Sequence, residues 1–114
     1  MAPHKLEDET LIALRAARKA MDSIDFVDAL EDRSKAERKA AAETLLAVVS
    51  AIRKGEVAQL KDIREDLDKE KDNLKAAIDE LKDALKDVED TVEVVAKANK
   101  LLSVVAKFAK VLVF

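Results

Sequence analysis

A heptad pattern without a Gly or Pro fills the second half of the chain. Counted with Val57 at position a, apolar residues occupy most of the a and d positions as far as Val113. Spacing of three and four residues keeps one apolar edge of a helix facing a partner, so the pattern favours a long packed helix. Position g is also largely apolar and contains several Ala, which indicates contact with at least two other helices.

Two shorter helices are expected in the first half. Apolar residues at helical spacing favour a helix over about residues 6–31, although the polar run that begins at Asp22 can also break or re-cap it. Ser34 and Glu37 have the spacing of a capping box, and Gly55 is a typical residue just after a helix C-terminus. A second helix is therefore expected over about residues 35–54, followed by a turn at Gly55.

The heptad region is expected to form one helix over about residues 56–113. Such a helix would span roughly 85 Å, against about 30 Å for the helix before it. It can bend near residue 72 or near residue 90, where Asp90 and Glu93 have cap spacing, but neither place has Gly or Pro. The predicted fold is a single all-α domain, an antiparallel helical hairpin or three-helix bundle with a long C-terminal helix.

Composition narrows the function classes. Cys is absent, which excludes disulfides and thiolate metal sites, and Gly and Pro occur once each, as in long helices. No signal peptide and no apolar run long enough to span a membrane is visible, so a cytoplasmic location is expected, or an unassigned one if the protein is exported without a visible signal. The net charge of −3 makes nucleic-acid binding unlikely.

Charge changes sign from segment to segment. Residues 1–34 and 56–90 are acidic on balance, whereas residues 35–55 and 91–114 are basic. Neighbouring helices of opposite sign favour lateral packing, and the acids of residues 56–90 fall mostly outside the apolar edge, interleaved with Lys. This arrangement is typical of a solvated, salt-bridged surface rather than of a cation site.

No group of residues indicates catalysis. His4 is the only His and has no second His or Cys with which to share a metal, and the sequence has no phosphate-binding Gly loop, nucleophile motif or zinc spacing. We therefore expect no enzyme activity, no catalytic residue, no metal and no cofactor.

The apolar edge points to assembly. The first half has too few large apolar residues to cover it, so we expect a structural or protein–protein interaction module, either a homo-oligomer or an adaptor with a helical protein partner. Asn99, at an a position, is a candidate for fixing helix register. The expected interface residues are Leu81, Leu85, Val92, Val95, Asn99, Leu102 and Phe108.

A membrane-surface role is the alternative. Over residues 92–114 the apolar arc widens to positions c and f, opposite a narrow strip of Lys, which is typical of a helix lying on an anionic membrane. It is equally typical of the innermost helix of a bundle. The residues that would face the membrane are Lys97, Lys100, Leu101, Val105, Lys107, Phe108, Lys110 and Leu112.

Overall fold

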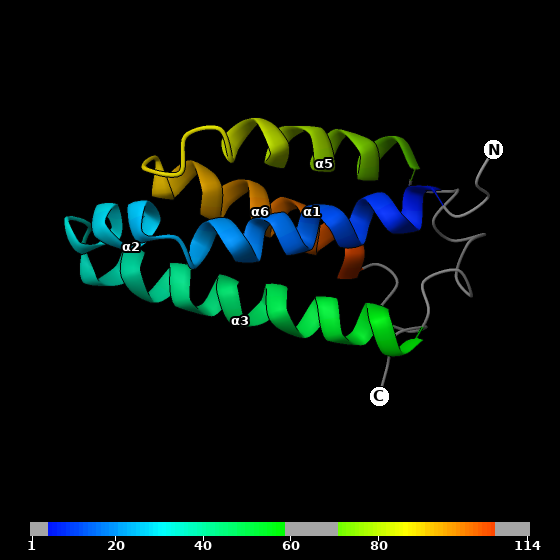
Figure 1. The fold of residues 1–114 in the computed structure, drawn as a ribbon, viewed down its shortest axis with the longest axis horizontal. Coiled ribbons are helices and arrows are strands. Elements are labelled where there is room, and N and C mark those ends of the chain that lie inside the picture. Colours follow the sequence, from blue (N-terminus) through cyan, green and yellow to red (C-terminus); the bar gives the residue numbers. More distant parts are fainter. Residues whose placement is uncertain (1–4, 59–70, 107–114) are drawn as a thin grey trace.

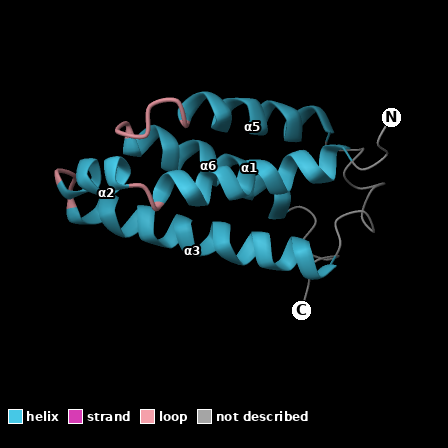
Figure 2. Ribbon diagram, viewed as in Figure 1, coloured by secondary structure: helices cyan, strands magenta, loops and turns pink. Residues whose placement is uncertain are grey.

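The computed structural model describes residues 5–58 and 71–106. Within these ranges the chain is all-α, without strands, as the sequence predicted, and the helices pack into a compact body (Figure 2). The helices are α1 (Lys5–Met21), α2 (Ile24–Glu31), α3 (Lys35–Ala58), α5 (Lys71–Ala84) and α6 (Thr91–Ala106).

Four of the helices lie side by side along the long axis, and the short α2 lies at one end (Figure 1). Helix α1 packs against α3 and α5, and α6 packs against the same two helices. The colours of Figure 1 show that α3 and α6 run in one direction while α1 and α5 run in the other. Each of the four therefore has one antiparallel and one parallel neighbour.

The core consists of two clusters of buried side chains. The larger receives residues from all four long helices, and the smaller lies near α2, where Phe26 is 2% exposed. The members of the larger cluster with no exposed surface are Ala17, Val48, Leu74, Ala77, Leu81 and Leu101. The smaller cluster is formed by Met21, Phe26, Ala41 and Val94.

The predicted helix over residues 6–31 is interrupted. Helix α1 ends at Met21, and the Ser23 hydroxyl donates a 2.6 Å hydrogen bond to the Ala20 carbonyl while accepting one from the Phe26 amide. One side chain thus closes one helix and caps the next, because Ser competes well for free backbone groups at helix ends. The expectation of a continuous or kinked helix was wrong, and the alternative of a break and new cap is the observed structure.

Helix α3 begins where the sequence predicted but ends later. The Glu37 amide donates to the Ser34 hydroxyl at 3.1 Å, and that hydroxyl donates to the Glu37 carboxylate. The predicted stop at Gly55 was wrong, because the helix continues through Gly55 to Ala58. No Pro follows to block the helix, and Gly inside a helix costs only about 1 kcal/mol relative to Ala.

The single helix over residues 56–113 was also wrong. Helix α5 ends at Ala84, the chain reverses over residues 85–90, and α6 returns along α5 (Figure 1). Short-range hydrogen bonds from the Lys86 and Asp87 amides close α5, and Asp90 accepts from the Glu93 amide at 3.3 Å to cap α6. The reversal lies at the second of the two predicted bends, whereas residues 59–70 and 107–113 lie outside the described residues.

The reversal changes which heptad positions are buried. In α5 the predicted a and d residues Leu74, Ile78 and Leu81 are buried. In α6 the buried residues are at g, c and f, among them Val94, Ala98 and Leu101. Helix α6 is thus rotated about its own axis relative to the predicted orientation, in which positions a and d face the core. As a result the a-position residues Val92 and Asn99 are exposed at the surface. Within the described residues, part of the predicted apolar edge is thus buried inside the bundle and part is exposed to solvent.

Candidate interaction groove

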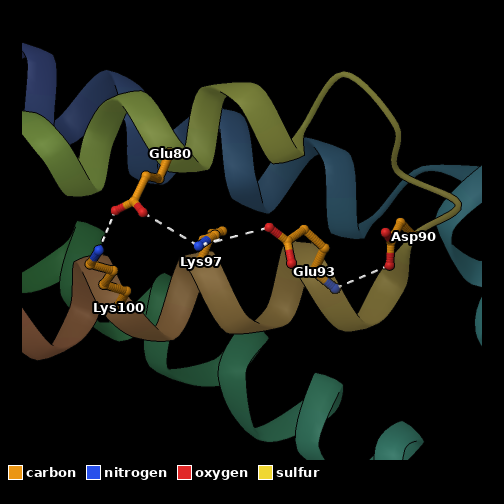
Figure 3. Close-up of polar contacts among 5 residues, drawn as sticks. All are labelled: Glu80, Asp90, Glu93, Lys97 and Lys100. Atoms are coloured by element: carbon orange, nitrogen blue, oxygen red, sulfur yellow. Dashed lines mark hydrogen bonds and ion pairs between the residues drawn. The ribbon is translucent and has the colours of Figure 1, made fainter.

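Charged side chains bridge α6 to α5 along one edge. Glu80 of α5 lies between Lys97 and Lys100 of α6; it is hydrogen-bonded to Lys100, and its carboxylate is 3.4 Å from the Lys97 ammonium (Figure 3). Glu93 lies 3.8 Å from Lys97 on its other side. The hydrogen bond from Lys100, helped by the charges of both lysines, lowers the pKa of Glu80 below its ordinary value of 4.5. The charged side chains named along this edge of α6 are therefore paired with one another.

The opposite edge of α6, toward α3, carries no such bridge among the residues described. Its cross-helix hydrogen bond joins two neutral groups, because the Thr44 hydroxyl donates to the Asn99 amide oxygen at 3.0 Å. Thr44 is 4% exposed, whereas Asn99 lies at the surface. The hydrogen bond between Thr44 and Asn99 joins the parallel helices α3 and α6.

A groove opens beside this hydrogen bond, toward the N-terminal end of α6. It has a volume of about 270 Å³, is open toward solvent and is bounded by α2, α3 and α6. Val92, one of its walls, is 47% exposed. The remaining walls are Leu30, Glu37, Ala40, Thr91, Val95, Ala96 and Asn99.

Thr91 gives the groove an unused polar group. The residue lines the groove and is 1% exposed, and its hydroxyl oxygen has no hydrogen-bond partner among the described residues. An unpaired buried hydroxyl costs free energy that the rest of the fold must offset, about 1 to 3 kcal/mol. The Thr91 hydroxyl is shielded from solvent, so it lies beneath the groove surface rather than on it.

A row of exposed, uncharged residues on α6 runs along the groove and continues one turn past it. Val92, Ala96, Asn99 and Ser103 recur at helical spacing and are all exposed, and we call these four residues the uncharged flank. On α3, Ala40 lines the groove and Ala47 lies on the same helical face two turns later. Glu37 supplies the carboxylate at the groove wall and is itself 3.9 Å from Arg33.

The seven predicted interface residues are divided between core and groove. Leu81 is fully buried, and Leu85 and Leu102 pack against the core. The groove brings together the three predicted residues of α6 that lie nearer its start, which are Val92, Val95 and Asn99. Phe108 lies outside the described residues.

The residues predicted to face a membrane are divided as well. Leu101 and Val105 are buried in the core, and Lys97 and Lys100 contact Glu80. Lys107, Phe108, Lys110 and Leu112 lie outside the described residues. Within residues 5–58 and 71–106, no helix has the length and apolar character needed to cross a membrane.

Sequence reasoning missed four residues that define the two edges. Glu80 was counted among surface acids, although Lys97 and Lys100 are three residues apart and so share a helical face that can hold one carboxylate. Thr44, Thr91 and Ala40 gave no signal, because their roles depend on how α3 and α6 meet.

Comparison with family models, curated proteins and solved structures finds no match for this chain. Among the residues that the structure describes, no group of three or more His, Cys, Asp or Glu is placed to hold a metal ion. The groove is therefore the feature from which a function has to be argued.

Proposed function

We propose that this protein is a structural or adaptor module that binds another protein segment through the groove between α2, α3 and α6. The observation that carries the proposal is the exposure of Val92 in an open, largely apolar groove between three helices. A partner would cover the apolar wall, in which Val92 is exposed. Covering it would lower the free energy of the exposed surface.

The size of the groove favours a side-chain anchor over a small-molecule ligand. Sites for drug-sized ligands usually enclose about 300–1,000 Å³ and cover most of the ligand. At about 270 Å³ and open toward solvent, this groove suits one or two apolar side chains presented by a helix or strand. The uncharged flank extends the surface along α6, so a partner helix could continue past the anchor without burying a charge from α6.

The packing of α6 supports a protein partner over a membrane. A membrane helix formed from residues 92–114 would have to withdraw Val94, Leu101 and Val105 from the core and separate Lys97 and Lys100 from Glu80. Removing three large side chains from a core costs several kcal/mol. The groove needs no such rearrangement.

Peptide selection tests the proposal even though the partner is unidentified. The protein would be immobilised sparsely, so that a second copy does not compete, and used to select binders from a displayed library of random peptides. We expect the enriched peptides to contain apolar anchors and to lose about tenfold or more in affinity for the Val92→Asp variant. Asp is well tolerated in the first turn of a helix, so this variant should fold normally.

Leu46→Asp is the matched control. Leu46 is 70% exposed, but it lies about 120° around α3 from Ala40 and does not line the groove. Peptides that use the groove should bind this variant as they bind the original protein. Failure to enrich peptides, or enriched peptides indifferent to Val92→Asp, would contradict the proposal.

A further inference from the structure

We infer that the partner at the groove is a second copy of this chain, packed so that α3 lies against α3 and α6 against α6 in opposite directions. This inference rests on the proposed function and names its partner. The contact would be made by one side of the bundle, which we call the α3–α6 face. It consists of the uncharged flank of α6 together with four residues of α3, all of them exposed, which are Ala36, Ala40, Glu43 and Ala47.

The α3–α6 face differs in charge from the outer surface of the neighbouring helix α5. Glu43 is its one charged member, whereas the exposed side chains of α5 include Lys71, Asp72, Lys75, Asp79, Lys82 and Asp83. A partner that covers the α3–α6 face therefore desolvates few charges, and the small side chains let two helices approach closely. Ala40 and Ala96 belong to this face and also line the groove, so a partner on the face covers the groove as well.

Acidic and basic side chains border the face on both sides. On α6, Glu93 and Lys100 lie along the edge toward α5, and each side chain is still 50% exposed. On α3, Lys39 and Glu43 are one turn apart and exposed, on the side of the helix turned away from α6. Neither of these two residues has an ion-pair partner among the described residues. Each border thus offers one acid and one base to a partner.

The charges on α6 determine where a two-fold axis would cross that helix. In an antiparallel pair of α6 helices the same edges meet, so Glu93 of one copy faces Lys100 of the other if the axis passes midway between them. That midpoint lies next to Ala96. Because Ala96 is small and exposed on the face, the two helices can approach closely at the axis.

The charges on α3 determine the axis independently. For Lys39 of one copy to face Glu43 of the other, the axis has to pass at Ala41, midway between them. Helices α3 and α6 are parallel, and the hydrogen bond between Thr44 and Asn99 shows where they are level, so residue 41 of α3 lies level with residue 96 of α6. One axis therefore brings acid against base on both borders of the face.

The helix dipoles select the antiparallel direction. A parallel dimer would place α3 against α6 of the other copy, where Lys39 would face Glu93 and Glu43 would face Lys100, so charge pairing allows both directions. The parallel dimer, however, would align the dipoles of four neighbouring helices, which is unfavourable. In the antiparallel dimer the dipoles of the two copies oppose one another.

Charge exchange between two variants tests the arrangement and its direction. Lys39→Glu should place like charges opposite Glu43 of the other copy, and Glu43→Lys should place them opposite Lys39, so each variant alone should dimerise about fivefold more weakly. An equimolar mixture of the two should regain the original affinity within about twofold, because each Glu then faces a Lys. A parallel dimer would regain nothing, since residues 39 and 43 would face α6, and that result would overturn the antiparallel arrangement.

Sedimentation equilibrium at high protein concentration supplies the dissociation constants. The two rows of the face, from Ala36 to Ala47 and from Val92 to Ser103, are each about 16 Å long, and two adjacent helices are about 20 Å wide. A face of this size is small for a protein interface, so we expect a dissociation constant above about 10 µM for the unmodified protein. High salt should raise it further.

Ala96→Glu tests the position of the axis. The substitution would place two carboxylates together where the α6 helices meet, and we expect it to raise the dissociation constant about 10- to 100-fold. Ala76→Glu is the matched control, because Ala76 is exposed on α5, outside the face, and Glu is well tolerated in exposed helices.

A monomer at all concentrations, or equal effects of Ala96→Glu and Ala76→Glu, would overturn the inference. If such a monomer still bound selected peptides through Val92, only the identity of the partner would be wrong. If it bound none, the proposed function would fail too.

Discussion

Along its edge toward α5, helix α6 presents Lys97 and Lys100 to Glu80, whereas along its other edge it presents Val92, Ala96 and Asn99 to solvent. The first edge is internally satisfied, and a partner there would have to desolvate charges that already have partners. The second edge exposes apolar surface and the neutral Asn99 side chain, so a partner desolvates no charge of α6 by covering it. The same helix thus holds the bundle together on one side and remains available on the other.

Leu81→Ala should have the largest effect on stability, and it tests whether the core and the groove contribute differently to folding. Leu81 and Val92 were both predicted interface residues, but Leu81 is fully buried. We expect Leu81→Ala to lower the free energy of unfolding by about 2–5 kcal/mol in chemical denaturation. Val92→Ala is the control and should change it by less than about 0.5 kcal/mol. Equal losses for the two variants would show that the groove wall belongs to the core.

The sequence predicted features that depend on neighbouring residues. The Ser34 and Glu37 cap was predictable because both partners lie within one turn, and the cap at Asp90 was visible for the same reason. A bend near residue 90 was predicted but a full reversal was not, because Leu85 and Val88 still pack against the core and the apolar period continues through the turn. A heptad pattern shows that apolar residues recur at helical spacing, but it shows neither that the chain has turned between them nor which face of the second helix is then buried.

The candidate groove was predictable only in part. Val92, Val95 and Asn99 stood out because they occupy a and d positions, and all three line it. Leu30, Ala40 and Thr91 did not stand out, because their place in the groove depends on α2 and α3 meeting α6. The rotation of α6 that exposes Val92 follows from the reversal and could not be derived without it.

Asn99→Ala should have the next largest effect on stability, because it removes the exposed acceptor of the hydrogen bond between Thr44 of α3 and Asn99 of α6. It leaves the Thr44 hydroxyl buried without its acceptor, which should cost about 1–3 kcal/mol of unfolding free energy. Thr44→Val should cost less, since it removes the buried hydroxyl and leaves Asn99 free to bind water. A double-mutant cycle measures the coupling, and equal costs for the two single variants would contradict this account.

Thr91→Val should stabilise the isolated bundle. The substitution removes a buried hydroxyl that has no partner among the described residues and keeps the side chain's shape, so a gain of about 1 kcal/mol is expected in urea denaturation. Thr44→Val is the matched control, because its hydroxyl is bonded and its loss should not stabilise. A loss of stability on Thr91→Val would mean that the hydroxyl has a partner in the folded protein.

Glu80→Gln should have the smallest effect on stability, and it tests the charged contacts between α5 and α6. Because the pKa of Glu80 is lowered in the folded protein, its contribution to stability is present above its ordinary value of 4.5 and is lost as the pH falls through the lower folded-state pKa. Glu80→Gln should therefore lower the melting temperature slightly at pH 7, and the difference should shrink as the pH falls below about 4. High salt should shrink it too, since both lysines and the carboxylate are partly exposed. Asp79→Gln is the control on the exposed face one residue earlier. If the difference in melting temperature grows as the pH falls, the Glu80 carboxylate is not stabilised by Lys97 and Lys100. The edge of α6 toward α5 would then not be held by paired charges, and the contrast with the other edge would fail.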